Sequence, residues 1–247
     1  MPRSNMNTTM AKTVLAGLLI FGIGYLWGSL TFVKQVFPFE QLRLIRHAVF
    51  SEPSEVIKPG PNTMWQERRD QFMLFGRQAD VVMIGDSLTQ SGHWQDMFPK
   101  ASIANRGIKG DGTDDILRRM DTILSVKPKK AFIMIGINDL YRGKSVDAVF
   151  KDYIEIINEL ESNNIQIYIQ STLECSDCGE RLGKVRLLNQ KLERLAVERK
   201  LTYININDGL TNRETGLLPD YTSDGIHLTG NGYVKWSQTI TPYISSI

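Results

Sequence analysis

The chain has 247 residues, a formal net charge of +2 and a hydrophobic fraction of 42%. This length suits one α/β domain with an appendage, and such a domain can bury a core without covalent staples. The near balance of charge, with no long run of Lys and Arg, argues against nucleic acid as a partner.

The first segment of interest is uncharged, from residue 14 to residue 33. About 20 residues at 1.5 Å each span roughly the 30 Å hydrocarbon core of a bilayer. A buried helix and a cleaved signal peptide are alternatives, but the apolar core is long for a signal peptide and no convincing Ala-x-Ala follows it. We therefore expect a tail at 1–13 and an uncleaved transmembrane anchor at 14–33. Gly24 and Gly28 form a G-x-x-x-G pair that could let two anchors pack closely in a homodimer.

The orientation of this anchor is not settled by charge. Arg3 and Lys12 favour a cytoplasmic N-terminus, whereas Lys34, Arg43 and Arg46 follow on the other side. The pair Cys175 and Cys178 favours placing the domain that follows the anchor outside the cytoplasm, on the periplasmic or extracellular side. Residues 34–63 hold several prolines and mixed charge, as a tether does, and lead to a domain at 64–247.

Along this domain the hydrophobic pattern alternates between helix and strand. The expected helices are 64–78, 113–125, 146–162, 181–199 and 232–244, and the expected strands are 81–84, 101–104, 130–135, 165–170 and 201–206. In the first helix, Trp65, Phe72 and Phe75 are predicted to pack on one face. Five strands alternating with helices predict a parallel sheet covered on both faces. Ligands then bind at the carboxyl ends of the strands.

Four polar segments follow the predicted strands at this edge. Gly85-Asp86-Ser87 comes directly after the first strand, where α/β enzymes place a nucleophile. Residues 105–111, 136–139 and 224–227 follow the second, third and fifth strands. Taken singly, each has an ordinary explanation as turn, capping or surface residues. Together they supply every group that acyl transfer needs.

The chemistry assigns a role to each residue type. A serine hydroxyl needs an adjacent base, for which His227 is the candidate, and Asp224 could hold the imidazole tautomer. The oxyanion needs hydrogen-bond donors, which the backbone N–H groups of Ser87 and Gly110 and the side-chain amide of Asn138 could provide. No metal or organic cofactor is implied, since the three histidines and two cysteines show no zinc-ligand spacing.

The cysteines, Cys175 and Cys178, are spaced C-x-x-C. In an exported domain they could close a small disulfide. Reduced structural thiols and a redox pair are the alternatives, although the interior Ser176-Asp177 is unlike a thioredoxin-type motif. A structural disulfide ranks first.

These segments carry a family resemblance. Gly85-Asp86-Ser87, Gly110, Gly136-Ile137-Asn138-Asp139 and Asp224-Gly225-Ile226-His227 resemble the four blocks of the SGNH, or GDSL, hydrolases. The resemblance implies a flavodoxin-like three-layer α/β/α sandwich from about residue 65 onward, with the roles given above. Residues 105–113 and 221–233 are most similar to the branch with platelet-activating-factor acetylhydrolase-like and lysophospholipase-like bacterial esterases. Lys109, where relatives often carry a small residue, and the cysteine loop depart from the pattern.

The sequence thus predicts a membrane-anchored serine esterase that hydrolyses an acetyl or other acyl ester of a small molecule, lipid or glycan. One alternative is an acyltransferase that uses the same triad to acylate a cell-envelope glycan. The other is a catalytically silent, anchored module that binds an envelope partner.

Overall fold

The structure, a computed structural model, describes residues 63–176 and 178–244. These residues belong to one compact unit, 61–247. The predicted anchor at 14–33, with Gly24 and Gly28, lies outside the described residues. Within the described ranges, no helix combines the length and the apolar character that crossing a membrane requires.

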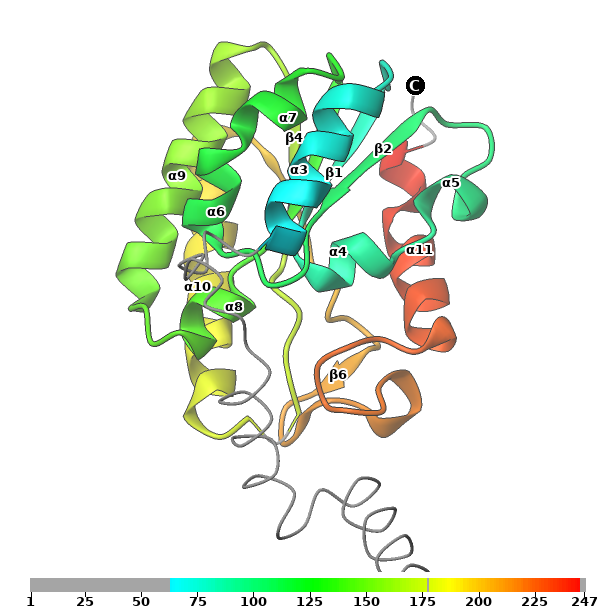
Figure 1. Ribbon diagram of the computed structural model, residues 1–247. Helices are drawn as coiled ribbons and strands as arrows, with labels where there is room; N and C mark the ends of the chain where they lie inside the picture. The colour runs from blue at the N-terminus through cyan, green and yellow to red at the C-terminus, as the bar shows by residue number, and fades with distance from the viewer. Residues whose placement is uncertain (1–62, 177, 245–247) are drawn as a thin grey trace, which may run out of the picture. The chain divides into compact units, whose positions relative to one another are not determined.

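A five-stranded sheet forms the centre of the unit (Figure 1). Its strands are β1 Val81–Gly85, β2 Ile103–Gly107, β3 Lys130–Met134, β4 Gln166–Gln170 and β5 Thr202–Ile204. Their spatial order is β2-β1-β3-β4-β5, and every neighbouring pair is parallel. This is the flavodoxin-like order, so the predicted parallel sheet is confirmed.

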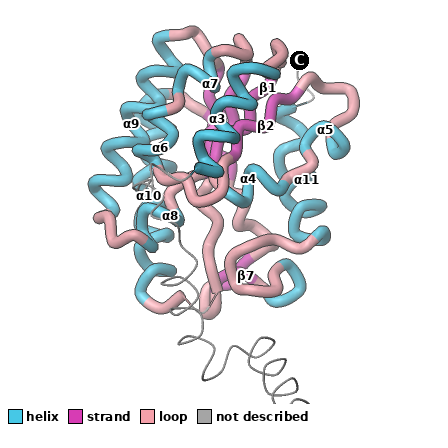
Figure 2. The backbone as a smooth tube through the Cα atoms, in the orientation of Figure 1, coloured by secondary structure: helices cyan, strands magenta, loops and turns pink. Residues whose placement is uncertain are grey.

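Helices cover both faces of this sheet, which confirms the three layers (Figure 2). They are α3 Thr63–Phe75, α4 Ser87–Ser91, α5 Trp94–Met97, α6 Thr113–Arg118, α7 Met120–Leu124, α8 Ile137–Tyr141, α9 Val146–Ser162, α10 Glu180–Arg199 and α11 Gly230–Ile244. Helices α6, α7, α9 and α10 pack on one face, and α4, α5 and α11 pack on the other. The chain also forms a short 3-10 helix, Pro219–Tyr221, and a small hairpin of β6 Thr211–Asn212 and β7 Gly216–Leu217.

Because helices cover both faces of the sheet, the strands contain runs of consecutive apolar residues. Successive side chains of a strand point to opposite faces, so both faces of a covered sheet need apolar residues. In β1, Val82 and Ile84 join the core beneath α9 and α10, whereas Val81 and Met83 join the core beneath α11. Trp236 of α11 is fully buried in this second core.

The fifth strand, predicted at 201–206, is limited to Thr202–Ile204. Two further elements differ from the prediction because buried polar side chains obscured them. The second strand extends through Asn105 and Arg106 to Gly107 instead of ending at residue 104. Arg106 is nevertheless buried, and its Nε donates to the carbonyl of Thr122 at 3.0 Å. The predicted helix 113–125 divides at Arg119, whose φ of −122° and ψ of 23° are not helical.

The aromatic face predicted for the first helix is only partly correct. Phe72 is buried, with 6% of its surface exposed, but Phe75 is 76% exposed. Trp65 is half-buried, and its indole N–H donates to Asp111 at 2.8 Å. Helix α3 therefore contacts the rest of the unit through Trp65, Phe72 and an ion pair of Arg69 with Asp121, whereas its last three residues, 73–75, are exposed.

Candidate active site

Ser87 is placed by a tight turn between β1 and α4. Asp86 caps this helix, because its Oδ1 accepts a hydrogen bond from the N–H of Leu88 at 2.9 Å. A Cβ atom at Gly85 would collide with the main-chain oxygen of Met134 in the neighbouring strand β3. Glycine therefore lets β1 run close to β3 and turn at once, which brings Ser87 to the carboxyl edge of the sheet.

Asp224 and His227 lie in one loop, closed by a bridge between Thr222 and Leu228. One carboxylate oxygen of Asp224 accepts the backbone N–H groups of Ile226 at 2.9 Å and His227 at 2.7 Å. The other oxygen lies 2.7 Å from Nδ1 of His227. The backbone N–H of His227 is the main cause that holds the pKa of Asp224 well below its usual range.

The turn between β1 and α4 and the loop of Asp224 and His227 meet at Ser87. Nε2 of His227 lies 3.0 Å from Oγ of Ser87. A carboxylate can only accept a hydrogen bond, so Asp224 requires the proton on Nδ1, and Nε2 is left to accept from the hydroxyl. Tyr233 of α11 donates to the carbonyl of Leu88 in α4 at 2.7 Å, which fixes the two helices that flank these residues. The structure thus brings together the three residues singled out in the sequence.

The expected oxyanion donors lie on three separate segments. Within residues 63–176 and 178–244, the backbone N–H groups of Ser87 and Gly110 donate no hydrogen bond to the protein, so neither is taken up by a protein acceptor there. The side-chain amide of Asn138, in α8, donates one hydrogen to the carbonyl of Asp111 at 2.9 Å and keeps a second one. Gly110 has a φ of +86° and no protein atom within 4 Å of the place of a Cβ. Glycine is needed there for its positive φ, not for lack of space.

A buried ion pair, which the sequence did not reveal, fastens the loop of Gly110 to the sheet. Asp111 accepts from Nε of Arg119 at 2.7 Å, and both side chains are at most 1% exposed. Arg119 also donates to the carbonyls of Arg106 at 2.7 Å and Gly85 at 3.3 Å. Burial raises the pKa of Asp111 to about 6 in spite of Arg119. The signal in the sequence was an arginine on the apolar face of helix 113–125.

A second polar cluster supports the same loop. Asp139 accepts from the N–H of Thr113 at 2.9 Å and from its hydroxyl at 2.8 Å, so it caps α6 and not its own helix. The carboxylates of Asp114, Asp139 and Asp152 offer oxygens within 4.8 Å of one another. Lys144 forms ion pairs with all three and supplies the positive charge that they need.

Asp86 stands next to the serine and is fully buried. Its Oδ2 has no hydrogen-bond partner among the residues that the structure describes, although Oδ1 caps α4. Burial raises the pKa of Asp86 to about 7. The carboxyl beside Ser87 therefore keeps its proton to a higher pH than an exposed aspartate, and the protonated form reduces the cost of burying it.

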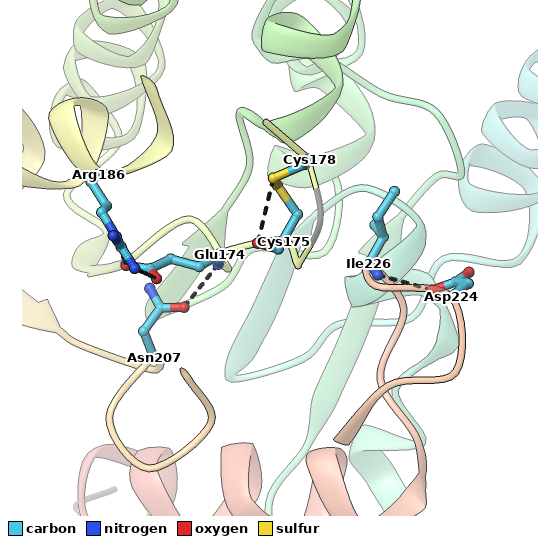
Figure 3. The surroundings of a disulfide bond; sticks show 7 residues. All are labelled: Glu174, Cys175, Cys178, Arg186, Asn207, Asp224 and Ile226. Carbon is cyan, nitrogen blue, oxygen red and sulfur yellow. Dashed lines mark hydrogen bonds and ion pairs between the residues drawn. A yellow bond between two sulfur atoms is a disulfide. The ribbon is translucent and has the colours of Figure 1, made fainter. Parts of the chain in front are cut away.

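A disulfide joins Cys175 and Cys178, whose Cα atoms are 6.0 Å apart, in the segment after β4 (Figure 3). The N–H of Ser176 donates to the carbonyl of Gly225 at 2.8 Å, in the loop that carries Asp224 and His227. On the other side, Glu174 forms a two-point ion pair with Arg186, at 2.8 and 3.1 Å. The disulfide loop therefore packs directly against the loop of His227.

A serine, an imidazole and a carboxylate linked in a row at the edge of a parallel sheet are the arrangement of serine hydrolases. Comparison with known proteins agrees. The sequence model of the GDSL-like Lipase/Acylhydrolase family matches residues 83–235, and the chain belongs to this family.

Individual relatives are distant. The chain is 27% identical to an N-acylneuraminate cytidylyltransferase of Streptococcus agalactiae over 158 residues, which are 63% of the chain and 36% of that protein. It thus spans about a third of this relative's length. It is 25% identical over 185 residues to human platelet-activating factor acetylhydrolase IB subunit alpha2, with 69% of the chain and 79% of that protein covered.

Among solved structures, the chain is similar to a GDSL-like lipase of Bacteroides thetaiotaomicron. The TM-score is 0.67 at 22% identity, over 73% of the chain and 97% of the lipase. At 22% identity, this similarity supports a shared fold and nothing further.

Proposed function

We propose that Ser87, His227 and Asp224 are the catalytic triad of a carboxylic ester hydrolase. His227 Nε2 takes the proton of the Ser87 hydroxyl while Oγ attacks the ester carbonyl, and the imidazolium then gives that proton to the leaving alcohol. Water attacks the acyl-serine by the same route and releases the acid. The observation that carries this proposal is the 3.0 Å contact between Oγ of Ser87 and Nε2 of His227.

The negative charge of the tetrahedral intermediate is assigned to three donors. These are the N–H groups of Ser87 and Gly110 and the free amide hydrogen of Asn138. The buried ion pair of Arg119 and the partly exposed cluster around Lys144 hold this loop in place before substrate arrives, so little reorganisation is needed during the reaction.

The substrate class follows from the relatives only in outline. One relative is an acetylhydrolase by name, which favours a short acyl group on a small-molecule, lipid or glycan alcohol. Transfer to a glycan acceptor would use the same acyl-serine. Product analysis of an ester substrate with and without a candidate glycan acceptor separates the two reactions, because a transferase yields acylated acceptor in place of free acid.

The test of the triad is Ser87→Ala in the full chain, assayed with 4-nitrophenyl acetate. Loss of the nucleophile should lower kcat by at least about 10³-fold and abolish labelling by a fluorophosphonate probe. Ser237→Ala, on the exposed side of α11, is the matched control and should retain both. Hydrolysis by Ser87→Ala at the wild-type rate would refute the assignment.

We further propose that residues 14–33 anchor the chain in a membrane and hold the hydrolase domain outside the cytoplasm. The uncharged run and the cysteine pair support this, because disulfides persist in oxidising compartments. Fractionation followed by an alkaline wash tests the anchor, and protease added to intact cells tests the side. A chain that leaves the membrane fraction on washing would contradict the anchor.

A further inference from the structure

A hollow of about 360 Å³ opens beside Gly110. Helix α3 forms one wall with Met64, Trp65 and Arg68, and the segment from Lys109 to Gly110 forms the other. Gln90 of α4, three residues after Ser87, completes the lining. Because Gly110 is a proposed oxyanion donor, a group in this hollow would belong to an ester whose carbonyl lies at Ser87.

The charges of the hollow are unbalanced. Arg68 and Lys109 form no ion pair within the described parts of the chain, and the contacts of the Arg68 guanidinium are a 3.5 Å hydrogen bond to Gln71 and the Phe72 ring. Glu67 is the single acid in the lining, so the net charge of the hollow is positive. The nearby cations Arg142 and Lys144 differ from Arg68 and Lys109, because each of them forms an ion pair with an aspartate.

The wall that carries Arg68 is held firmly against the site. The indole N–H of Trp65 donates to Asp111, the residue after Gly110, at 2.8 Å. Asp111 is in turn fixed by Arg119, so α3 and the Gly110 loop share one buried anchor. Met64, 66% exposed, adds an apolar surface at the rim. A rigid wall with apolar and cationic parts suits a small ester that carries a negative charge.

We propose that this hollow is the subsite for an anionic group of the substrate, a carboxylate or a phosphate, which Lys109 and Arg68 bind while the ester carbonyl lies against Gly110. This inference rests on the proposed function and narrows it to anionic esters. The charge could sit on the alcohol or on the acyl group, and the experiment has one arm for each.

The test uses two matched pairs of esters with the full chain. In the first pair, the acetyl ester of glycerol 3-phosphate is compared with the acetyl ester of glycerol. In the second, 4-nitrophenyl hydrogen succinate is compared with 4-nitrophenyl butyrate. We expect kcat/KM to be about fivefold higher for the anionic member of at least one pair, mainly through a lower KM. Salt at about 0.5 M should reduce this preference.

Variants then test whether Lys109 and Arg68 cause the preference for anionic esters. Lys109→Gln and Arg68→Gln should each lower the ratio of anionic to neutral kcat/KM about threefold, and Arg68→Lys should keep most of it. Lys129→Gln is the control, because Lys129 precedes β3 at the opposite edge of the sheet and pairs with Asp80. Thermal unfolding checks that α3 is intact in the Arg68 variants, and Lys109→Gln tests the proposal without touching α3.

The absence of a preference in both pairs, or a preference that survives in Lys109→Gln and Arg68→Gln combined, would overturn this inference. Hydrolysis of the neutral esters that still depends on Ser87 would leave the proposed function standing in that case. Failure to hydrolyse every ester, without fluorophosphonate labelling of Ser87, would overturn both.

Discussion

Nε2 of His227 lies 3.0 Å from Oγ of Ser87, although 140 residues separate the two along the chain. The contact depends on Asp224, which fixes both the main chain and the ring of His227. In Asp224→Asn, the side-chain amide of the new asparagine can donate a hydrogen bond to Nδ1 of His227. That contact favours the tautomer with the proton on Nε2, which cannot accept the proton of Ser87. We expect kcat to fall by about 10²- to 10⁴-fold with KM little changed. Asp220→Asn, exposed in the preceding 3-10 helix, should behave as wild type.

Asn138 has two tasks, since one amide hydrogen holds the carbonyl of Asp111 and the other is assigned to the oxyanion. Asn138→Ala should lower kcat by about 10²- to 10³-fold, the usual cost of removing one such donor. Asn231→Ala, on the exposed side of α11, serves as the control. An unchanged kcat in Asn138→Ala would remove this residue from the site.

The buried pair of Arg119 and Asp111 predicts a large loss of stability when one partner is removed. Arg119→Met leaves the carboxylate of Asp111 buried without its charge partner and frees the carbonyls of Arg106 and Gly85. We expect about 3–5 kcal/mol less free energy of unfolding in urea titrations. Arg118→Met, next in sequence but 59% exposed, should cost less than about 1 kcal/mol. Equal losses in both variants would contradict the role of Arg119.

The raised pKa of Asp86 predicts a pH dependence of stability. The carboxyl of Asp86 has a pKa of about 7 in the folded chain, whereas in the unfolded chain it has the ordinary aspartate pKa of 3.8. Between these values the folded state binds more protons, so the free energy of unfolding should decrease as pH rises through this window. Asp86→Asn keeps the acceptor for Leu88 and cannot ionise.

This dependence is measured as a difference between wild type and Asp86→Asn. From about pH 5 to about pH 7.5, wild type should lose roughly 2 kcal/mol of unfolding free energy relative to the variant. Asp70→Asn, 66% exposed in α3, should follow the wild-type curve. Parallel curves for wild type and Asp86→Asn would show that Asp86 does not titrate in this range.

The disulfide predicts a link between oxidation and activity. The loop of Cys175 and Cys178 supports Gly225 through Ser176, and a Cβ at Gly225 would meet atoms of Ser176. Replacing both cysteines by serine should lower the free energy of unfolding by about 2 kcal/mol, the estimate for a short closed loop. It should also lower kcat several-fold, because the loop of His227 loses its support.

Reduction offers the control for this experiment. Dithiothreitol should lower the activity of the wild type and leave the double serine variant unaffected. Activity that is insensitive to both changes would limit the disulfide to a structural role away from His227.

The sequence by itself determined the order of elements, the parallel sheet and the candidate residues. Apolar periodicity reports burial directly, so α9 matches its expected range of 146–162 and β1, β3 and β4 fall within a residue or so of expectation. The three candidate residues of the proposed triad stood out because Ser87 comes directly after a predicted strand, and Asp224 and His227 lie in the loop between the fifth predicted strand and the last helix. Parallel strands end at one edge of a sheet, so these segments were expected to meet there.

Only the tertiary structure revealed what holds that edge together. Arg119, Asp111 and Asp139 are charged, and a charge in a sequence predicts exposure. These three are nevertheless buried, because partners on neighbouring segments of the fold satisfy them. Phe75 shows the reverse, since an aromatic residue at helical spacing proved to be exposed. The pattern of a sequence encodes the preference of each residue for water, whereas the partner that overrides this preference exists only once distant segments meet.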